Sequence, residues 1–215
     1  MDDEIVIETD MNITEYRGSE MRPQLINYLT ELLMSTWQED DEPTLMEPRI
    51  YIGGISTRYR SSTWLTDNKI DTIIQYCTDK EIYDYDETLP IKIIKRPIED
   101  SAFEATSTQL YEYGYQIIED EYNQDKNILL QCYLGKSRSA SMYMAWRMLK
   151  YNERFITAYT YAKEKRSCIT STLAITLVKF ETEYCKDIED TLMTKMARKY
   201  VIDKFMKTTR SYNNL

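Results

Sequence analysis

The sequence predicts an α/β fold, in which a mostly parallel central sheet of about four to five strands carries helices on both faces. Short apolar runs typical of buried strands alternate along the chain with longer stretches that have helical periodicity. The 215 residues suffice for one domain with helical extensions at both ends, and the 42 % hydrophobic and 29 % charged content is typical of a globular protein. No apolar run approaches the ~20 residues of a membrane span, so we expect none.

The N-terminal region, residues 1–47, is expected to form an acidic arm. It holds 13 acidic and 2 basic residues, a net charge of −11, whereas the rest of the chain has a net charge of +2. Residues 22–37 have the apolar spacing of one amphipathic helix, which is expected to pack on the domain or to form a homodimer with a second copy. Residues 38–48 are expected to be a linker. The near-neutral remainder lacks the basic excess of a nucleic-acid binder, so no nucleic-acid partner is expected.

The central domain is expected to span residues 48–185. Strands are predicted at residues 50–52, 70–76, 91–95 and 127–131. Helices are predicted at residues 59–68, 106–124, 138–151, 155–165 and 172–184, the second with Leu110, Tyr113, Ile117 and Ile118 on one side. Residues 186–215 are predicted to form an amphipathic helix and a polar tail. Ligands bind at the carboxyl ends of parallel strands, where Cys77, the Arg96–Asp100 segment and Cys132 fall.

The most informative stretch is residues 127–141, which predicts a strand, a tight loop and a helix. Cys132 ends the strand, Gly135 lies in the loop, and Arg138 begins the helix. Backbone N–H groups in such a loop converge on one anion, and the helix N-terminus adds partial positive charge that favours a thiolate. The arginine offers a planar fork for two phosphate oxygens. The Cys-x5-Arg spacing, placed between an apolar strand and a helix with a glycine in the loop, therefore predicts phosphoryl transfer to a nucleophilic cysteine.

The remaining composition narrows the chemistry further. The chain contains no histidine, which removes every histidine-based catalytic scheme. Its four cysteines, Cys77, Cys132, Cys168 and Cys185, are widely spaced and include no Cys-x2-Cys pair. This is neither a zinc pattern nor a disulfide framework, so we expect no metal, no cofactor and a reducing cytoplasmic or nuclear setting. The acidic start, Met1-Asp-Asp-Glu, does not have the features of a secretory signal.

These residues together resemble the dual-specificity protein phosphatase family, within the cysteine-based tyrosine phosphatases. The likeness covers about residues 48–185 and includes the Cys132–Ser141 loop, Ile50-Tyr-Ile-Gly53, Ile70-Asp-Thr-Ile-Ile74 and Pro97-Ile-Glu-Asp100. It implies a cysteine-phosphatase-like fold and hydrolysis of phosphotyrosine, and of phosphoserine or phosphothreonine, in a phosphorylated protein substrate. The reaction would pass through a phosphocysteine.

The resemblance also implies a role for each site residue. Cys132 would be the nucleophile, Ser139 would stabilise the departing thiolate, and Asp100 would act as general acid and then as general base, with Glu99 its nearest competitor. The phosphoryl oxygens would be held by Arg138 and by the backbone of Tyr133, Leu134, Gly135, Lys136, Ser137 and Arg138. No metal is required, because the arginine and the amides take the place of a cation.

One residue departs from the family pattern. Gln131 stands where the family has a histidine before its cysteine, which predicts a thiol that ionises less readily and weaker activity. Two alternatives therefore stay open: a weakly active or inactive pseudophosphatase that binds a phosphorylated partner, and a phosphatase of RNA 5′ ends or phosphoinositides, with which Lys136 is compatible. Cys77 is either a buried thiol or a reversible disulfide partner that protects Cys132 from over-oxidation.

Overall fold

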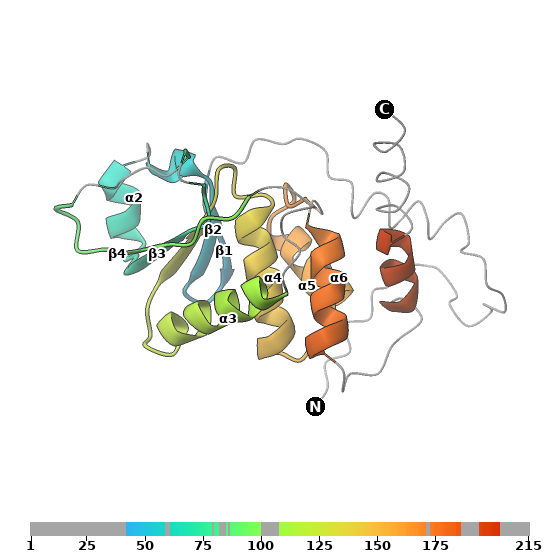
Figure 1. The fold of residues 1–215 in the computed structure, drawn as a ribbon. Helices are drawn as coiled ribbons and strands as arrows, with labels where there is room; N and C mark the ends of the chain where they lie inside the picture. Colours follow the sequence, from blue (N-terminus) through green and yellow to red (C-terminus); the bar gives the residue numbers. More distant parts are fainter. Residues whose placement is uncertain are drawn as a thin grey trace.

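The structure, a computed structural model, describes residues 42–202 except 59–60, 79, 82–84, 86, 100–107, 171–172 and 186–193. Within these residues, five strands form one sheet in the order β1-β2-β5-β3-β4 (Figure 1). Their bounds are Thr44–Glu47 (β1), Ile50–Gly53 (β2), Thr72–Gln75 (β3), Lys92–Lys95 (β4) and Ile128–Gln131 (β5). Only β1 runs antiparallel to its neighbour, and all other pairs are parallel. The predicted α/β fold is confirmed, and the strand that precedes Cys132 is the central one.

Helices cover both faces of the sheet, as predicted. Their bounds are Ile55–Arg58 (η2, a 3-10 turn), Ser61–Asp67 (α2), Gln109–Tyr122 (α3), Arg138–Lys150 (α4), Phe155–Lys165 (α5) and Ala174–Tyr184 (α6). On one face Leu65 of α2 packs with Ile73 of β3 and Leu129 of β5. On the other face Ile74 and Leu130, the next residue of each strand, pack with α3 to α6 (Figure 1). Successive side chains of a strand point to opposite faces, so both faces of these strands are apolar.

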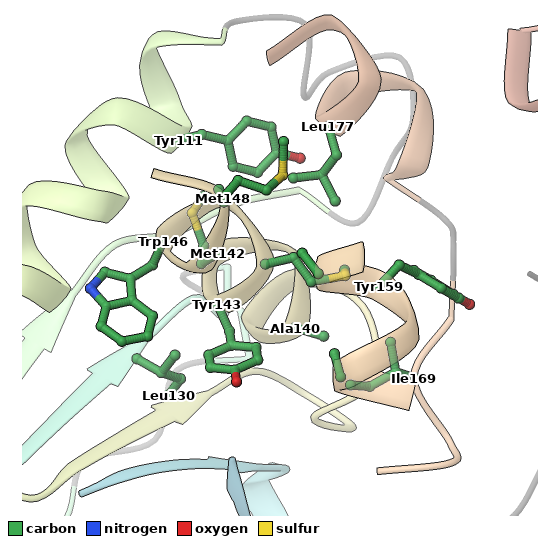
Figure 2. Packing of buried hydrophobic residues seen from close by; sticks show 14 of the residues in the cluster. Tyr111, Leu130, Ala140, Met142, Tyr143, Trp146, Met148, Tyr159, Ile169 and Leu177 are labelled. Atoms are coloured by element: carbon green, nitrogen blue, oxygen red, sulfur yellow. The ribbon is translucent and has the colours of Figure 1, made fainter. Parts of the chain in front are cut away.

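Helix α4 is the centre of the larger core. It is buried along nearly its whole length because apolar residues occupy every side of it rather than one stripe. In Figure 2, Met148 points toward Tyr111 of α3 and Leu177 of α6, whereas Tyr143 and Trp146 point toward Leu130 of β5. Fully burying a large apolar side chain contributes roughly 1.5–3 kcal/mol. The helix that begins at Arg138 is therefore fixed from all sides, and its first turn is rigidly placed at the end of β5.

Two sequence predictions are wrong in detail. Residues 44–47 form strand β1 rather than part of a linker, because they pair with β2 and bury Met46 beneath the sheet. Tyr113 does not lie on the buried side of α3 but is 69 % exposed. The buried side of that helix carries Gly114, where a Cβ atom would lie 2.5 Å from the sulfur of Met142. Glycine does not count as an apolar residue when helical periodicity is read from a sequence. The close approach of α3 and α4 at Gly114 could therefore not be predicted.

The described part of the C-terminal extension packs against the domain. Residues 194–202 are helical, and Met196 and Val201 are buried, as the predicted amphipathic pattern requires. Arg198 pairs with Glu181 of α6 at 2.7 Å, and the other oxygen of Glu181 accepts a hydrogen bond from the backbone N–H of Phe155. The predicted N-terminal helix at residues 22–37 lies outside the described residues. No helix in the described part of the chain is long and apolar enough to cross a membrane.

Candidate active site

Cys132 lies where β5 ends, between the carboxyl ends of β2 and β3. Its backbone N–H donates to the Gly53 carbonyl at 3.4 Å, and its side chain is almost fully buried. The Ser139 hydroxyl, in the first turn of α4, donates to the Cys132 sulfur at 3.2 Å. The structure therefore brings together two of the predicted site residues. A hydroxyl that donates to sulfur stabilises the thiolate relative to the thiol.

Gly135 gives the loop its shape. Its φ angle is +67°, in the left-handed region that residues with a Cβ atom rarely adopt. A Cβ atom at this position would lie 2.5 Å from the Gly53 carbonyl carbon and 2.8 Å from the Gly54 nitrogen. The Tyr133 carbonyl accepts a hydrogen bond from the backbone N–H of Ile55 at 3.0 Å. The backbone of Gly53 and Gly54 thus packs directly against the loop and supports it. The sequence analysis did not predict this role.

Arg166 holds the loop from the side of α5. Its side chain is fully buried, and its Nε donates to the Gly135 carbonyl at 3.0 Å. Its Nη1 donates to the Glu42 carbonyl and to the Thr44 hydroxyl, each at 2.8 Å. One guanidinium thus links the loop between β5 and α4 to the segment that leads into β1. The sequence analysis assigned no role to Arg166, which directly follows α5.

Arg138 is buried and bound by a carboxylate that the sequence analysis did not single out. Its Nη1 donates to Glu81 Oε2 at 2.6 Å, and its Nη2 donates to Glu81 Oε1 at 3.3 Å. Glu81 Oε2 also accepts from the backbone N–H and the hydroxyl of Thr78, at 3.0 and 2.9 Å. The hydrogen bond from Arg138 is the main cause that lowers the pKa of Glu81 to about 2. Glu81 is therefore ionised at any working pH.

The other residues of the predicted phosphate loop differ in exposure. Tyr133 and Leu134 present exposed side chains, whereas Lys136 and Ser137 are buried. The backbone N–H of Thr170 donates to the Lys136 carbonyl at 3.0 Å, which fixes the second half of the loop. Of the six residues between the buried strand and the buried helix, Cys132, Tyr133, Gly135 and Lys136 are thus held through backbone groups.

Asp100, the predicted general acid, lies outside the described residues. The segment that leads to it does not: the Ile98 carbonyl accepts a hydrogen bond from Arg138 Nη1 at 3.3 Å. Glu99, its nearest competitor, is exposed. The described part of this segment therefore ends beside Arg138.

Cys77 follows β3, the strand next to β5, and is a buried free thiol, as is Cys132. Burial, and then the neighbouring Cys132, raise the pKa of Cys77 to about 12. At neutral pH this thiol is protonated and weakly nucleophilic.

A buried sulfur at the end of the central strand, a hydroxyl that donates to it and an arginine in the first turn of the next helix form the arrangement expected of a cysteine-based phosphatase. Residues 50–183, more than half of the chain, match the family described as "Dual specificity phosphatase, catalytic domain". The chain belongs to this family, and it is a phosphatase of the dual-specificity and protein-tyrosine class. Membership implies phosphorylated proteins as the class of substrate.

Similar proteins agree with this assignment. AMV078 of Amsacta moorei entomopoxvirus, which is named as a tyrosine-protein phosphatase, is 28 % identical over 144 residues, or 63 % of this chain and 83 % of that protein. Dual specificity protein phosphatase 1 of Arabidopsis thaliana is 24 % identical over 132 residues, or 61 % of this chain and 64 % of the relative. The match therefore spans just under two thirds of the Arabidopsis protein.

Solved structures share the fold. The human tyrosine phosphatase-like serine/threonine/tyrosine-interacting protein gives a TM-score of 0.60 at 20 % identity, covering 67 % of this chain and 99 % of that one. Human DUSP28 gives a TM-score of 0.58 at 14 % identity, covering 69 % and 97 %. At such identities the likeness concerns the fold alone.

Proposed function

We propose that this chain hydrolyses phosphotyrosine, and phosphoserine or phosphothreonine, in proteins through a phosphocysteine formed on Cys132. The observation that carries the proposal is the 3.2 Å hydrogen bond from the Ser139 hydroxyl to the Cys132 sulfur, at the start of α4. A hydroxyl that donates to sulfur stabilises the negative charge that a cysteine carries as a nucleophile and as a leaving group.

In the first step the Cys132 thiolate attacks phosphorus, and the bond from phosphorus to the substrate oxygen breaks. Asp100 donates its proton to that oxygen, so the product leaves as a neutral alcohol or phenol. Arg138 and the loop amides bind the three non-bridging oxygens, which carry the charge through the transition state. The carboxylate of Glu81 keeps the guanidinium of Arg138 in place.

In the second step a water molecule attacks phosphorus, and the Asp100 carboxylate takes its proton. The sulfur–phosphorus bond breaks, and inorganic phosphate and the Cys132 thiolate are released. The Ser139 hydroxyl already donates to that sulfur, so it stabilises the thiolate as charge returns to it.

The test is hydrolysis of a phosphotyrosine peptide by the wild type and by Cys132→Ser, Asp100→Ala and Asp67→Ala. We expect Cys132→Ser to lower kcat by about 10³-fold or more, since it removes the nucleophile. Asp100→Ala should lower kcat by roughly 10²-fold, since it removes general acid–base catalysis. Asp67, an exposed carboxylate at the end of α2, is the matched control and should leave kcat unchanged. A Cys132→Ser variant that retains activity would exclude the mechanism.

A second candidate function, a module that binds a phosphorylated partner with little turnover, is favoured by Gln131 in place of the family's histidine. No wild-type turnover, together with phosphopeptide binding that is lost in Arg138→Met, would establish this reading. Parallel assays with a phosphoinositide and a 5′-phosphorylated RNA separate the remaining substrate classes, and only the phosphopeptide is expected to react.

We also propose that Cys77 forms a reversible disulfide with oxidised Cys132. Peroxide would first convert the Cys132 thiolate to a sulfenic acid, and the Cys77 thiol would displace water from it to form the disulfide. The high pKa of Cys77 predicts a slow second step that accelerates as the pH rises. Peptide mapping after peroxide treatment at pH 7 and pH 9 tests this, with Cys185 as a buried control thiol. Recovery of only unlinked or sulfonic Cys132 at both pH values would exclude the disulfide.

A further inference from the structure

Gln131 is buried at the end of β5, on the face of the sheet opposite to Cys132. In the parallel pairing of β3 and β5 it lies directly beside Gln75, the last residue of β3. Leu129, two residues earlier, belongs to the cluster on the α2 face, whereas Cys132 belongs to the core on the α4 face. The side chain of Gln131 therefore does not share a face with the sulfur, and any effect it has on the site passes through the backbone.

The amide of Gln131 is fully engaged. Its Nε2 donates to the Gly54 carbonyl at 3.2 Å and to the Tyr85 hydroxyl at 2.5 Å. Its Oε1 accepts from Gln75 Nε2 at 3.1 Å. Gln131 and Gln75 are only 1 % and 2 % exposed, so water cannot replace these hydrogen bonds. A primary amide offers two donors and an acceptor together, which is what these three partners require.

Gly54 is the point at which this network meets the catalytic loop. A Cβ atom on Gly54 would lie 3.0 Å from the Tyr133 carbonyl oxygen, and one on Gly135 would lie 2.5 Å from the Gly53 carbonyl carbon. Cys132 and Ile55 add two backbone hydrogen bonds across the same contact. With no side chains between the two backbones, a shift of the Gly53–Gly54 turn moves the loop that carries the nucleophile.

We propose that Gln131 and Gln75 form a neutral amide brace that positions the Gly53–Gly54 turn, and through it the phosphate-binding amides of residues 133–138. Gln131 is a positioning residue for the loop, and its own charge state plays no part, since an amide does not titrate. This inference rests on the proposed function only for its kinetic readout. The anion affinity of the loop tests it independently of turnover.

The experiment compares Gln131→Met and Gln75→Met with Gln116→Met, an exposed glutamine of α3 that serves as the matched control. Methionine keeps the length of the side chain and removes every hydrogen bond. The affinity for inorganic phosphate is measured in the Cys132→Ser background, and kcat and KM for a phosphotyrosine peptide are measured in the wild-type background. Melting temperatures are recorded for each variant, so that both assays are run well below unfolding.

We expect Gln131→Met to weaken phosphate binding and to lower kcat/KM by roughly 10- to 100-fold, because the loop amides lose their alignment. Gln75→Met removes one of the three hydrogen bonds and should have a smaller effect in the same direction. Gln131→His, whose neutral ring retains one donor and one acceptor, should restore most of both quantities at pH 8. Gln116→Met should change neither.

The proposal would be overturned if Gln131→Met kept both its phosphate affinity and its kcat/KM within twofold of the wild type, whatever its melting temperature. Gln131 would then be a packing residue. If Gln131→Met does not fold, Gln75→Met and Tyr85→Phe can be used instead, because each removes one hydrogen bond of the network. Wild-type phosphate affinity in both of these variants would also overturn the proposal. If the wild type binds phosphate but does not turn over, the proposed catalysis fails while the binding arm still tests the brace.

Discussion

The catalytic loop and the residues that support it differ in how they are distributed along the chain. Cys132, Gly135, Arg138 and Ser139 lie within eight consecutive positions. Their supports come from distant segments: Gly53 ends β2 and Gly54 follows it, Glu81 follows β3, and Arg166 follows α5. The loop carries the proposed reacting groups, and the distant residues fix the positions of these groups. The order of the loop therefore depends on contacts with residues from distant parts of the sheet.

The strongest way to break the loop itself is Gly135→Ala. The methyl group would require a left-handed φ that costs about 1–2 kcal/mol, and it would also collide with the backbone of Gly53, which has no flexible atoms to yield. We expect kcat/KM to fall by about 100-fold or more, as is typical when catalytic groups shift by about 1 Å.

Gly114→Ala provides a matched comparison in α3. Its Cβ atom would also approach a neighbour to 2.5 Å, but that neighbour is the sulfur at the flexible end of Met142. The helix gains from alanine, so activity should stay within about twofold of the wild type. Similar activities for the two alanine variants would show that the loop is not held by its contact with the Gly53–Gly54 turn.

The next largest effect is expected when a support is removed. Arg166→Met leaves the Gly135 and Glu42 carbonyls and the Thr44 hydroxyl without this donor, and it should lower the free energy of unfolding by about 3 kcal/mol. Urea unfolding measures this loss. The exposed neighbour Lys165→Met is the control and should change stability by less than about 0.5 kcal/mol. Equal stabilities would mean that Arg166 does not hold the loop.

The same contrast explains what the sequence could and could not predict. The segment from β5 through Cys132 to α4 was predictable because an apolar run, a glycine and a Cys-x5-Arg spacing are adjacent, and each has a local physical meaning. The parallel sheet followed from the alternation of strands and helices. Strand β1 was missed because four residues with mixed polarity owe their conformation to pairing with β2 rather than to their own pattern.

The supports could not be predicted for a related reason. Glu81 is 57 residues from Arg138 in the sequence, and Arg166 is 31 residues from Gly135, so nothing local links either pair. Gln131 and Gln75 become partners only through the register of two parallel strands. One signal was present: Thr78 and Glu81 have the spacing of a capping box, in which the carboxylate accepts a hydrogen bond from the backbone N–H three residues earlier.

The smallest of these effects, and the most informative about the supports, is expected for Glu81→Gln. The amide keeps the shape of the carboxylate, but its NH2 group cannot accept, so one of the two hydrogen bonds from Arg138 is lost and the other no longer ends on a charged oxygen. If Glu81 positions the guanidinium for phosphate, kcat/KM should fall by roughly 10-fold, comparable to the loss of one well-placed charged interaction. The exposed Glu87→Gln is the control. An increase in kcat/KM would instead mean that Glu81 competes with phosphate for Arg138.

Acid unfolding measures the contribution of the Glu81–Arg138 ion pair to the free energy of unfolding, separately from its proposed role in catalysis. The pKa of Glu81 is about 2 in the folded protein against an ordinary value of 4.5, so its contribution to stability is complete above about pH 4.5. That contribution is lost as the pH falls from 4.5 toward 2. The wild type should therefore be more stable than Glu81→Gln by a constant amount between pH 5 and 8, and the difference should shrink below pH 4.5. A difference in kcat/KM at pH 7 without this pH-dependent difference in stability would place the effect of Glu81 on the bound phosphate rather than on the resting position of Arg138.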